Sequence, residues 1–384
     1  MVVRELGSPA GPGSGEPNLA MAPDGRVLLS WIEPAGEGRH VLRYARLDGN
    51  GSWSPPRVIA EGAGWFVNWA DFPALAVLPD GTLFAHWLAK SGPSTYAYDV
   101  QVARSRDDGK TWSRPVVPHR DGTQTEHGFV SMTPWSGPAM GIVWLDGRKT
   151  AGATRDAHGE AAGEMSLVHT TLDRDGRLGA ETILDGRACD CCQTDAARAG
   201  DAVVVVYRDR SEKEVRDMAV VRFVDGGWSP PRPLAADGWE INGCPVNGPA
   251  IAADGARVAV AWFTAAGDKP AVKVAFSGDS GAGFGGPIVV DDGRPLGRVD
   301  VVLLESDTAL VSWLEQGATG AAALRIRRIA RDGTRGAAAT VAESTGARSS
   351  GFPRMIRSGS KVILAWRDAS DPPKVRTGIL DLAP

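Results

Sequence analysis

The stretch "PALAVLPDGTLFAHW", residues 73–87, decides the fold of this chain. A short apolar strand is followed by a Pro-Asp-Gly turn, and a second apolar strand then ends in an aromatic residue. This second strand recurs seven times, at spacings of 51 to 63 residues. The copies are VLLSW (27–31), LFAHW (83–87), MGIVW (140–144), VVVVY (203–207), VAVAW (258–262), ALVSW (309–313) and VILAW (362–366). They indicate one repetitive domain over residues 1–384.

Each copy lies in a unit of four expected strands. In the second unit, "DVQVARS" (99–105) supplies an alternating third strand and "WSRPVVP" (112–118) a short fourth one. Four-stranded units repeated around an axis are typical of a β-propeller. We therefore predict an all-β propeller with seven four-stranded blades. A six-bladed ring with an extra hairpin is the alternative.

The two ends of the chain suggest how the ring closes. The last unit supplies only three strands, in "FPRMIRSG" (352–359), "KVILAWRD" (361–368) and "KVRTGILDL" (374–382). The N-terminal "VVRELGS" (2–8) resembles fourth strands elsewhere, such as "PRVIAEG" (56–62). Because an open ring would leave sheet edges unpaired, we expect the N-terminal strand to complete the last blade.

One turn carries a recognisable motif. "SRDDGKTW" (105–112) fits the pattern S-x-D-x-G-x-T-W through Ser105, Asp107, Gly109, Thr111 and Trp112. In such a turn the aspartate accepts backbone N–H bonds, the glycine adopts a positive φ and the tryptophan packs into the blade. The pattern is the Asp-box, and the chain resembles the sialidases and other BNR-repeat proteins. Degenerate copies at 46–53, 171–179, 222–228 and 276–284 extend the resemblance over the repeat array.

The resemblance implies a fold more than a reaction. It implies that the functional face lies opposite the Asp-boxes. Sialidases use three arginines to hold a carboxylate, a Tyr/Glu nucleophile pair and an Asp acid/base, but no residue here matches that set by motif. Catalytic residues therefore stay unassigned.

Strand order places the blade-to-blade loops and the ends of the second strands on this functional face. The candidate ligand-binding residues there are Trp65, Trp69, Asp146, Arg148, Arg208, Asp209, Trp239, Glu240, Asn242, Arg367 and Asp368. The arginines and aspartates would either pair between blades and brace the ring, or clamp an anionic ligand. The polar insertion 147–164 is expected to form a loop over the same face.

All four cysteines lie on two adjacent loops of this face. Cys189, Cys191 and Cys192 are in "RACDCCQTD" (187–195), and Cys244 is in "GWEINGCPVNG" (238–248). We expect them to hold a soft metal, with His127 as an extra ligand. The run C-x-C-C differs from the C-x2-C pair of zinc ribbons, so copper is the first expectation and zinc the alternative. His40, His86, His119, His158 and His169 show no metal-site spacing.

Two other interpretations of the cysteines stay open. They could form disulfides, for example from Cys189 or Cys192 to Cys244, as an even cysteine count in an exported protein suggests. They could also include a redox-active or nucleophilic thiol.

Composition narrows the class of partner. The formal net charge of −4 argues against a general nucleic-acid binder, and the absence of a run of 18 apolar residues argues against a membrane span. The first residues lack the pattern of a signal peptide. We expect a periplasmic or extracellular bacterial protein whose signal peptide is absent from this sequence, with a cytoplasmic location as the alternative.

The leading hypothesis is an exported propeller that holds copper at a cysteine-rich channel mouth, for binding or redox. The alternative is a glycan-directed, exo-sialidase-like hydrolase or a carbohydrate-binding propeller with disulfide-bonded cysteines. A third hypothesis is a scaffold for a protein partner. The sequence leaves open whether the protein is an enzyme.

Overall fold

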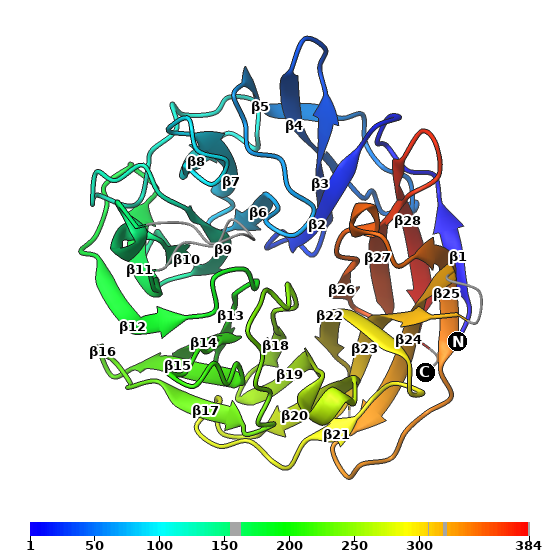
Figure 1. The fold of residues 1–384 in the computed structure, drawn as a ribbon. Coiled ribbons are helices and arrows are strands. Elements are labelled where there is room, and N and C mark those ends of the chain that lie inside the picture. The colour runs from blue at the N-terminus through cyan, green and yellow to red at the C-terminus, as the bar shows by residue number, and fades with distance from the viewer. Residues whose placement is uncertain (154–162, 306, 318–320, 383–384) are drawn as a thin grey trace.

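Seven β-sheets stand radially around a central axis in the computed structural model (Figure 1). The structure describes residues 1–153, 163–305, 307–317 and 321–382. The predicted all-β propeller with seven blades is confirmed. Part of the expected loop at 147–164, including His158, lies outside the described residues.

Each blade takes its strands from consecutive parts of the chain. Blade 1 contains β2 (Gly15–Met21), β3 (Val27–Pro34), β4 (Arg39–Arg46) and β5 (Arg57–Ala63). Blade 2 contains β6 (Ala74–Val77), β7 (Leu83–Lys90) and β8 (Tyr98–Ser105), and a bridge from Val102 to Val116 marks its outermost strand. Blade 3 contains β9 (His127–Pro134), β10 (Ala139–Asp146), β11 (Met165–Asp173) and β12 (Thr182–Ala188).

The remaining blades follow the same plan. Blade 4 contains β13 (Asp195–Ala199), β14 (Ala202–Arg208), β15 (Met218–Val224) and an outer strand split into β16 (Gly227–Trp228) and β17 (Arg232–Ala235). Blade 5 contains β18 (Ala250–Asp254), β19 (Arg257–Thr264), β20 (Ala271–Ser277) and β21 (Ile288–Val289). Blade 6 contains β22 (Pro295–Leu303), β23 (Thr308–Gln316), β24 (Ala321–Ala330) and β25 (Ala339–Thr345). The described helices are the short 3-10 turns η1 (Arg148–Thr150), η2 (Ala266–Asp268) and η3 (Arg348–Ser350).

The N-terminal strand closes the ring as predicted. Blade 7 contains β26 (Arg354–Ser358), β27 (Lys361–Asp368) and β28 (Lys374–Asp381), and β1 (Val3–Leu6) pairs antiparallel with β28. The pairing runs from Val3 opposite Leu380 to Leu6 opposite Thr377. The innermost strands β2, β6, β9, β13, β18, β22 and β26 contact one another in order around the axis (Figure 1). Both ends of the chain are thereby fixed in one sheet.

The aromatic residue of each repeat packs between blades. Trp31, Trp144, Trp262 and Trp313 are fully buried, and the residues in the other three copies are at most 8% exposed. A buried indole N–H needs an acceptor. Trp144 Nε1 donates to Asp146 Oδ2 at 2.8 Å, and Trp31 Nε1 donates to Glu33 Oε1 at 2.7 Å, each two residues further along the strand. In these copies of the repeat the tryptophan and its acceptor therefore lie on the same strand.

The Asp-box forms the turn that its sequence predicts. Asp107 accepts hydrogen bonds from Ser105 Oγ at 2.8 Å and from the Thr111 backbone N at 2.9 Å. Gly109 has φ 73°, and the Trp112 ring meets the Tyr44 ring of blade 1 edge to face. The degenerate copy from Ser277 to Gly283 repeats these hydrogen bonds. Asp-boxes thus link the outer parts of neighbouring blades.

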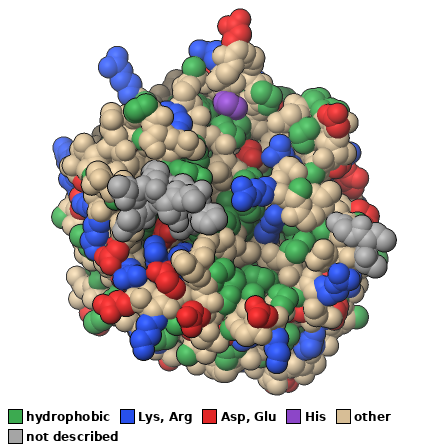
Figure 2. All heavy atoms as spheres, in the orientation of Figure 1, with side chains coloured by type: hydrophobic (Ala, Val, Ile, Leu, Met, Phe, Trp, Pro, Cys, Tyr) green, Lys and Arg blue, Asp and Glu red, His purple; other side chains and the backbone are tan. Residues whose placement is uncertain are grey.

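Charges of both signs are mixed around the rim of the face seen in Figure 2, with hydrophobic side chains nearer its centre. This face therefore lacks the continuous basic surface that a nucleic-acid backbone needs. Within the described part of the chain, no helix is both long and apolar enough to cross a membrane.

Candidate functional site

A cavity of about 510 Å³ opens on the face opposite the Asp-box of blade 2. Tyr98, which lines it, begins β8, whereas Ser105 of the Asp-box ends the same strand. Loops from several blades form its walls. The lining includes Phe66, Trp69, Asp71, Tyr98, Glu126, Asp190, Cys191, Asn242, Cys244 and Arg348.

The two cysteine-bearing loops are joined by buried hydrogen bonds. The Gln193 side chain accepts from the Gly248 backbone N at 2.9 Å. Arg208 donates to the carbonyl oxygen of Asn247 at 2.7 Å, and its own carbonyl accepts from the Cys189 N at 3.0 Å. Because these bonds lie away from water, they hold the loops in one relative position. The predicted proximity of the two loops is therefore present.

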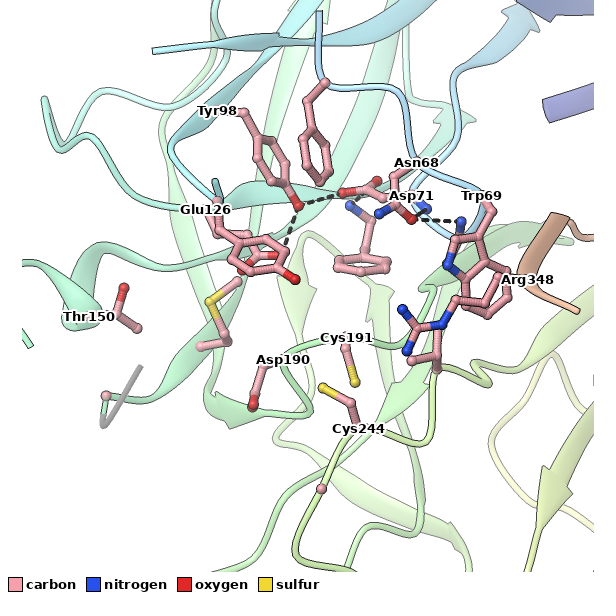
Figure 3. Close-up of a pocket in the computed structure, with 18 of the residues that line it drawn as sticks. Asn68, Trp69, Asp71, Tyr98, Glu126, Thr150, Asp190, Cys191, Cys244 and Arg348 are labelled. Atoms are coloured by element: carbon pink, nitrogen blue, oxygen red, sulfur yellow. Dashed lines mark hydrogen bonds between the residues drawn. The ribbon is translucent and has the colours of Figure 1, made fainter. Parts of the chain in front are cut away.

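Three thiols of one loop form a compact cluster. Cys189 Sγ lies 3.1 Å from Cys192 Sγ and 4.0 Å from Cys191 Sγ. Cys189 and Cys192 are buried, whereas Cys191 is partly exposed and Cys244 is exposed. Cys244 reaches the cluster from the second loop, with its sulfur toward that of Cys191 (Figure 3). None of the four cysteines forms a disulfide in the structure.

The tightest pair corrects one step of the sequence argument. The run C-x-C-C contains a C-x2-C pair, formed by Cys189 and Cys192, and these two sulfurs lie nearest to each other. Spacing therefore does not argue against zinc, and the choice of metal rests on the donor atoms.

Buried guanidinium groups surround the sulfur atoms. Arg216 Nη1 donates to Cys189 Sγ at 3.4 Å and is itself paired with Glu214 at 3.0 Å. Burial opposes ionisation of Cys192, but hydrogen bonds from the neighbouring thiols and the charge of Arg208 hold its pKa well below the usual value. Burial raises the pKa of Cys189 to about 11. The cluster is therefore arranged to hold at least one thiolate, at Cys192.

A phenol between two carboxyl groups forms the opposite wall. Tyr98 Oη lies 2.8 Å from Asp71 Oδ2 and 2.8 Å from Glu126 Oε1 (Figure 3). One phenol hydrogen cannot serve two acceptors, so both contacts are hydrogen bonds only if one carboxyl group carries a proton. Burial raises the pKa of Asp71 to about 7, which favours Asp71 as the group that holds this proton.

The predicted ligand-binding residues divide into two groups. Trp69 and Asn242 line the cavity together with Cys191 and Cys244. The others do not line it: Trp65, Asp146, Arg148, Arg208, Asp209, Trp239, Glu240, Arg367 and Asp368. Several of these side chains instead contact other residues of the propeller.

The arginines among them have internal partners. Arg148 pairs with Asp146 at 2.7 Å, and Arg367 of blade 7 pairs with Glu16 of blade 1 at 3.3 Å. Arg208 lies over the Trp239 ring, 4.8 Å from its centroid. These contacts favour the bracing interpretation over an anion clamp.

His127 lies apart from the thiols. It is fully buried at the start of β9, and its ring stacks on His119 with 3.7 Å between centroids. The group of potential ligand atoms around Cys189 contains Cys191 and Cys192; Cys244 is outside this compact group, and so is His127. Sequence reasoning did not nominate His119 or Tyr98, because their partners come from segments with no shared motif.

Comparisons with known proteins agree with this fold. The family model described as a BNR repeat-like domain matches residues 37–294. A protein of unknown function from Dyadobacter fermentans has a TM-score of 0.56 at 14% identity, covering 100% of this chain and 98% of that chain. An α-L-arabinanase from Penicillium chrysogenum, solved with arabinobiose, has a TM-score of 0.53 at 14% identity, covering 100% and 98%.

A third similar structure is the polysaccharide lyase Uly1, with a TM-score of 0.54 at 10% identity, covering 94% of this chain and 88% of that chain. At such identities the likeness shows the fold alone. Among curated proteins, none matches the sequence significantly. The family match spans well over half of the chain, and together with the Asp-box geometry and the closed ring it shows that the chain belongs to the BNR repeat-like domain family.

Proposed function

We propose that this protein binds a soft metal ion, copper(I) in the first place, through Cys189, Cys191, Cys192 and Cys244. The observation that carries the proposal is the cluster of three thiols on one loop, in which Cys189 Sγ lies 3.1 Å from Cys192 Sγ and 4.0 Å from Cys191 Sγ. Cys244 approaches this cluster from the second loop, at Cys191. Thiolates are the ligands that Cu(I) and Zn(II) take most readily. The described group of donor atoms around Cys189 contains sulfur only, which favours the softer ion, copper(I). Zinc is the alternative.

The charge balance supports an anionic sulfur site. Several thiolates around a monovalent ion would leave a net negative charge in a buried place, which is costly without compensation. Arg216, fully buried and bonded to Cys189, and Arg208, whose charge acts on Cys192, supply that compensation. Bound copper(I) would bring a soft Lewis acid with one-electron redox chemistry to this wall of the cavity.

Access to the cluster supports exchange of the ion. Cys191 and Cys244 line the cavity, whereas Cys189 and Cys192 lie behind them. An ion could therefore arrive at the outer pair and be held by the inner pair. We further propose that the protein is exported. In an oxidising compartment thiols this close would form disulfides, so a bound metal would be needed to keep them as ligands.

The test is metal loading of the purified full chain with a parallel thiol count. Copper(I) is offered anaerobically, zinc(II) in a separate sample, and both are desalted before elemental analysis by mass spectrometry. We expect near one copper per chain, lost in Cys189→Ser and reduced in Cys244→Ser. Asn242→Ala is the matched control, since Asn242 lines the same cavity on the same loop but offers no soft ligand.

Three results would change the proposal. If the protein retained zinc and released copper, zinc would become the proposed metal. Unchanged copper retention in both cysteine variants would remove the two-loop site. No retained metal together with no free thiols would mean disulfides.

The Tyr98 wall supports a second candidate, a glycan-directed activity. The resemblance to sialidases implies a Tyr/Glu nucleophile pair and an aspartic acid, and Tyr98 contacts both Glu126 and Asp71. Aromatic side chains from Phe66, Trp69 and Tyr96 also line the cavity, as sugar rings require of a binding site. Among the described lining residues, however, Arg348 is the only arginine. An uncharged sugar therefore suits this cavity better than a sialic acid, whose carboxylate needs several cations.

Glycan-array binding and hydrolysis of fluorogenic glycosides test this second candidate. Binding or cleavage of neutral glycosides that Tyr98→Phe abolishes would support it. Silence on the array together with uncleaved neutral and sialylated substrates would remove it. Neither result depends on the metal.

A further inference from the structure

A buried cluster of histidines and carboxylates lies on the other side of the wall that Tyr98 and Glu126 form. Side chains alternate along a strand, so Asp99 and His127, the next residues, point away from the cavity wall. His119, from the loop after β8, joins them with its side chain 5% exposed. The His127 side chain is fully buried. This cluster shares no residue with the thiol site.

Three atoms of this cluster face one another without hydrogen-bond partners. His119 Nε2 lies 3.8 Å and His127 Nδ1 3.7 Å from Asp99 Oδ1. Each of these three atoms is buried and unpaired in the described structure. A buried polar atom left without a partner costs about 1–3 kcal/mol, so three such atoms at one point indicate a missing ligand.

A second carboxylate holds the opposite edges of both rings. Asp121 Oδ2 lies 3.0 Å from His127 Nε2 and 3.6 Å from His119 Nδ1. Asp121 is itself positioned by hydrogen bonds from the backbone N and the hydroxyl of Thr123. If His127 carries its hydrogen on Nε2 and donates it to Asp121, and His119 carries its hydrogen on Nδ1, the near nitrogens present lone pairs toward Asp99. Metal-binding histidines are oriented by carboxylates in this way.

We propose that Asp99, His119 and His127 form a site for a borderline divalent cation, zinc(II) by preference. Two imidazole nitrogens and one carboxylate oxygen are a donor set that zinc takes with three protein ligands and one open position. The separations of 3.7 and 3.8 Å from Asp99 Oδ1 suit ligands around one ion of this size. The rings stack at an interplanar angle of 1°, so they must tilt for their lone pairs to converge on the ion.

The surrounding charges favour a cation. Asp121 and Asp146 are both close to His127, at 3.0 and 3.9 Å from Nε2. Arg148 is the neighbouring cation, 3.7 Å from Asp121, and it is also paired with Asp146. When both imidazoles are neutral, Asp99 adds a further negative charge. In the described contacts Arg148 pairs with Asp121 and Asp146 but not with Asp99. A divalent ion would compensate this charge.

The site would lie directly behind the Tyr98 wall. Asp99 follows Tyr98 on β8, and His127 follows Glu126 at the start of β9. A cation bound there would fix these two strand ends relative to each other. The protein would then hold two metals of different class, one on sulfur and one on nitrogen and oxygen.

The test uses the full chain, stripped with a chelator and titrated with cobalt(II) as a spectroscopic substitute for zinc(II). Cobalt on thiolates gives an intense charge-transfer band, whereas cobalt on nitrogen and oxygen gives only weak d–d bands. We expect one equivalent of the second kind, displaced by zinc, in wild type and in Cys189→Ser. Asp99→Asn and His119→Gln should lose it, and Asp121→Asn should weaken it by about 10- to 100-fold.

Controls separate ligand loss from misfolding. His169→Gln removes another buried histidine, which packs on Trp135 and Trp228 rather than on carboxylates, and it should bind as wild type. Asp99, with its side chain 24% exposed, is the safest substitution, and unchanged circular dichroism would show that the variant folds. The proposal would be overturned if wild type bound no cobalt outside the thiolate site. It would also be overturned if folded Asp99→Asn bound cobalt as wild type does. Either result leaves the copper proposal standing, because the ligands differ.

Discussion

Cys189 Sγ lies 3.1 Å from Cys192 Sγ, and the two residues form a buried C-x-x-C pair without a bond between them. A disulfide needs about 2.05 Å, so a small movement would join them. Cys192 is the member of the cluster with a lowered pKa. Burial raises the pKa of this thiol, but hydrogen bonds from the neighbouring thiols and the charge of Arg208 outweigh that effect. As a thiolate, Cys192 is the sulfur of the cluster that reacts most readily with an oxidant small enough to reach its buried position.

The first prediction concerns oxidation of the metal-free protein. Hydrogen peroxide should convert the Cys192 thiolate to a sulfenic acid, which the Cys189 thiol turns into a disulfide with loss of water. Peptide mapping should find the Cys189–Cys192 bond, also in Cys244→Ser. Prior loading with zinc(II), which hydrogen peroxide does not oxidise, should slow it. A first bond between Cys191 and Cys244 would contradict the assignment of the thiolate.

The second prediction concerns Arg208, which is 2% exposed and directs its donors to backbone carbonyls. Its guanidinium donates to the oxygens of Arg216, Asn247 and Phe263 at 2.6 to 2.7 Å. Arg208→Met keeps the aliphatic stem but leaves these carbonyl oxygens without a donor. Each unsatisfied carbonyl costs about 1–3 kcal/mol of stability, part of which a water molecule can restore. We expect the free energy of unfolding to fall by about 3–5 kcal/mol in urea titrations.

Arg26→Met is the control for this substitution. Arg26 makes an exposed ion pair with Asp24 at 2.5 Å, and such pairs contribute at most about 1 kcal/mol. An equal loss in the two variants would mean that Arg208 does not organise the cysteine loops.

The fold could be predicted because its information is local and repeated. The strand ending in Trp31 and its six counterparts carry one pattern, and each copy constrains the others. The closing strand at Val3 followed from an edge that would otherwise be unpaired. Local turn chemistry likewise placed Asp107 correctly, since its partners lie within four residues.

The candidate site was only partly predictable, because its contacts join residues far apart in the chain. Cys244 could be placed near Cys191 from loop order alone. Tyr98 and Asp71 are 27 residues apart, and nothing in their local sequence shows that they meet. His127 was expected near the thiols, whereas strand alternation turns its side chain to the other side of β9, toward His119.

The third prediction concerns pH and Asp71. Burial raises the pKa of Asp71 from 3.8 to about 7, so the folded state keeps a proton that the unfolded state releases above about pH 4. Between these two pKa values the unfolded state binds fewer protons, and stability must fall as pH rises. The decrease in the free energy of unfolding is complete above pH 7 and amounts to about 4 kcal/mol at most.

Asp71→Asn tests this directly. The amide is neutral at every pH and can donate to Tyr98 while its oxygen accepts from the Phe129 N, which Asp71 does at 2.7 Å. Urea unfolding at several pH values should show a shallower fall in stability between pH 4 and 7 for the variant than for wild type. Parallel curves for the two proteins would show that Asp71 is ionised throughout.

The fourth prediction separates backbone strain from crowding at the Asp-box. Gly109 has φ 73°, and a Cβ there would lie 1.9 Å from the Tyr44 hydroxyl of blade 1. Gly25 has φ 80°, and a Cβ at that position would meet no atom within 4 Å. Gly25→Ala should therefore show only the cost of a positive φ, about 1 kcal/mol. Gly109→Ala should lose about 1–3 kcal/mol more, because the side chain forces blades 1 and 2 apart.

Urea unfolding of both variants measures the difference, and the Tyr44 contact decides its meaning. A Tyr44→Phe background removes the contact at 1.9 Å but leaves a ring carbon 2.6 Å from the added Cβ. The extra loss in Gly109→Ala should therefore shrink in part, while the effect of Gly25→Ala stays the same. Equal losses for the two glycines in wild type would show that the Asp-box turn does not press against blade 1. A larger loss at Gly109 that Tyr44→Phe relieves would establish the Asp-box as a contact that sets the spacing between neighbouring blades, and hence the position of the strand that carries Tyr98 at its other end.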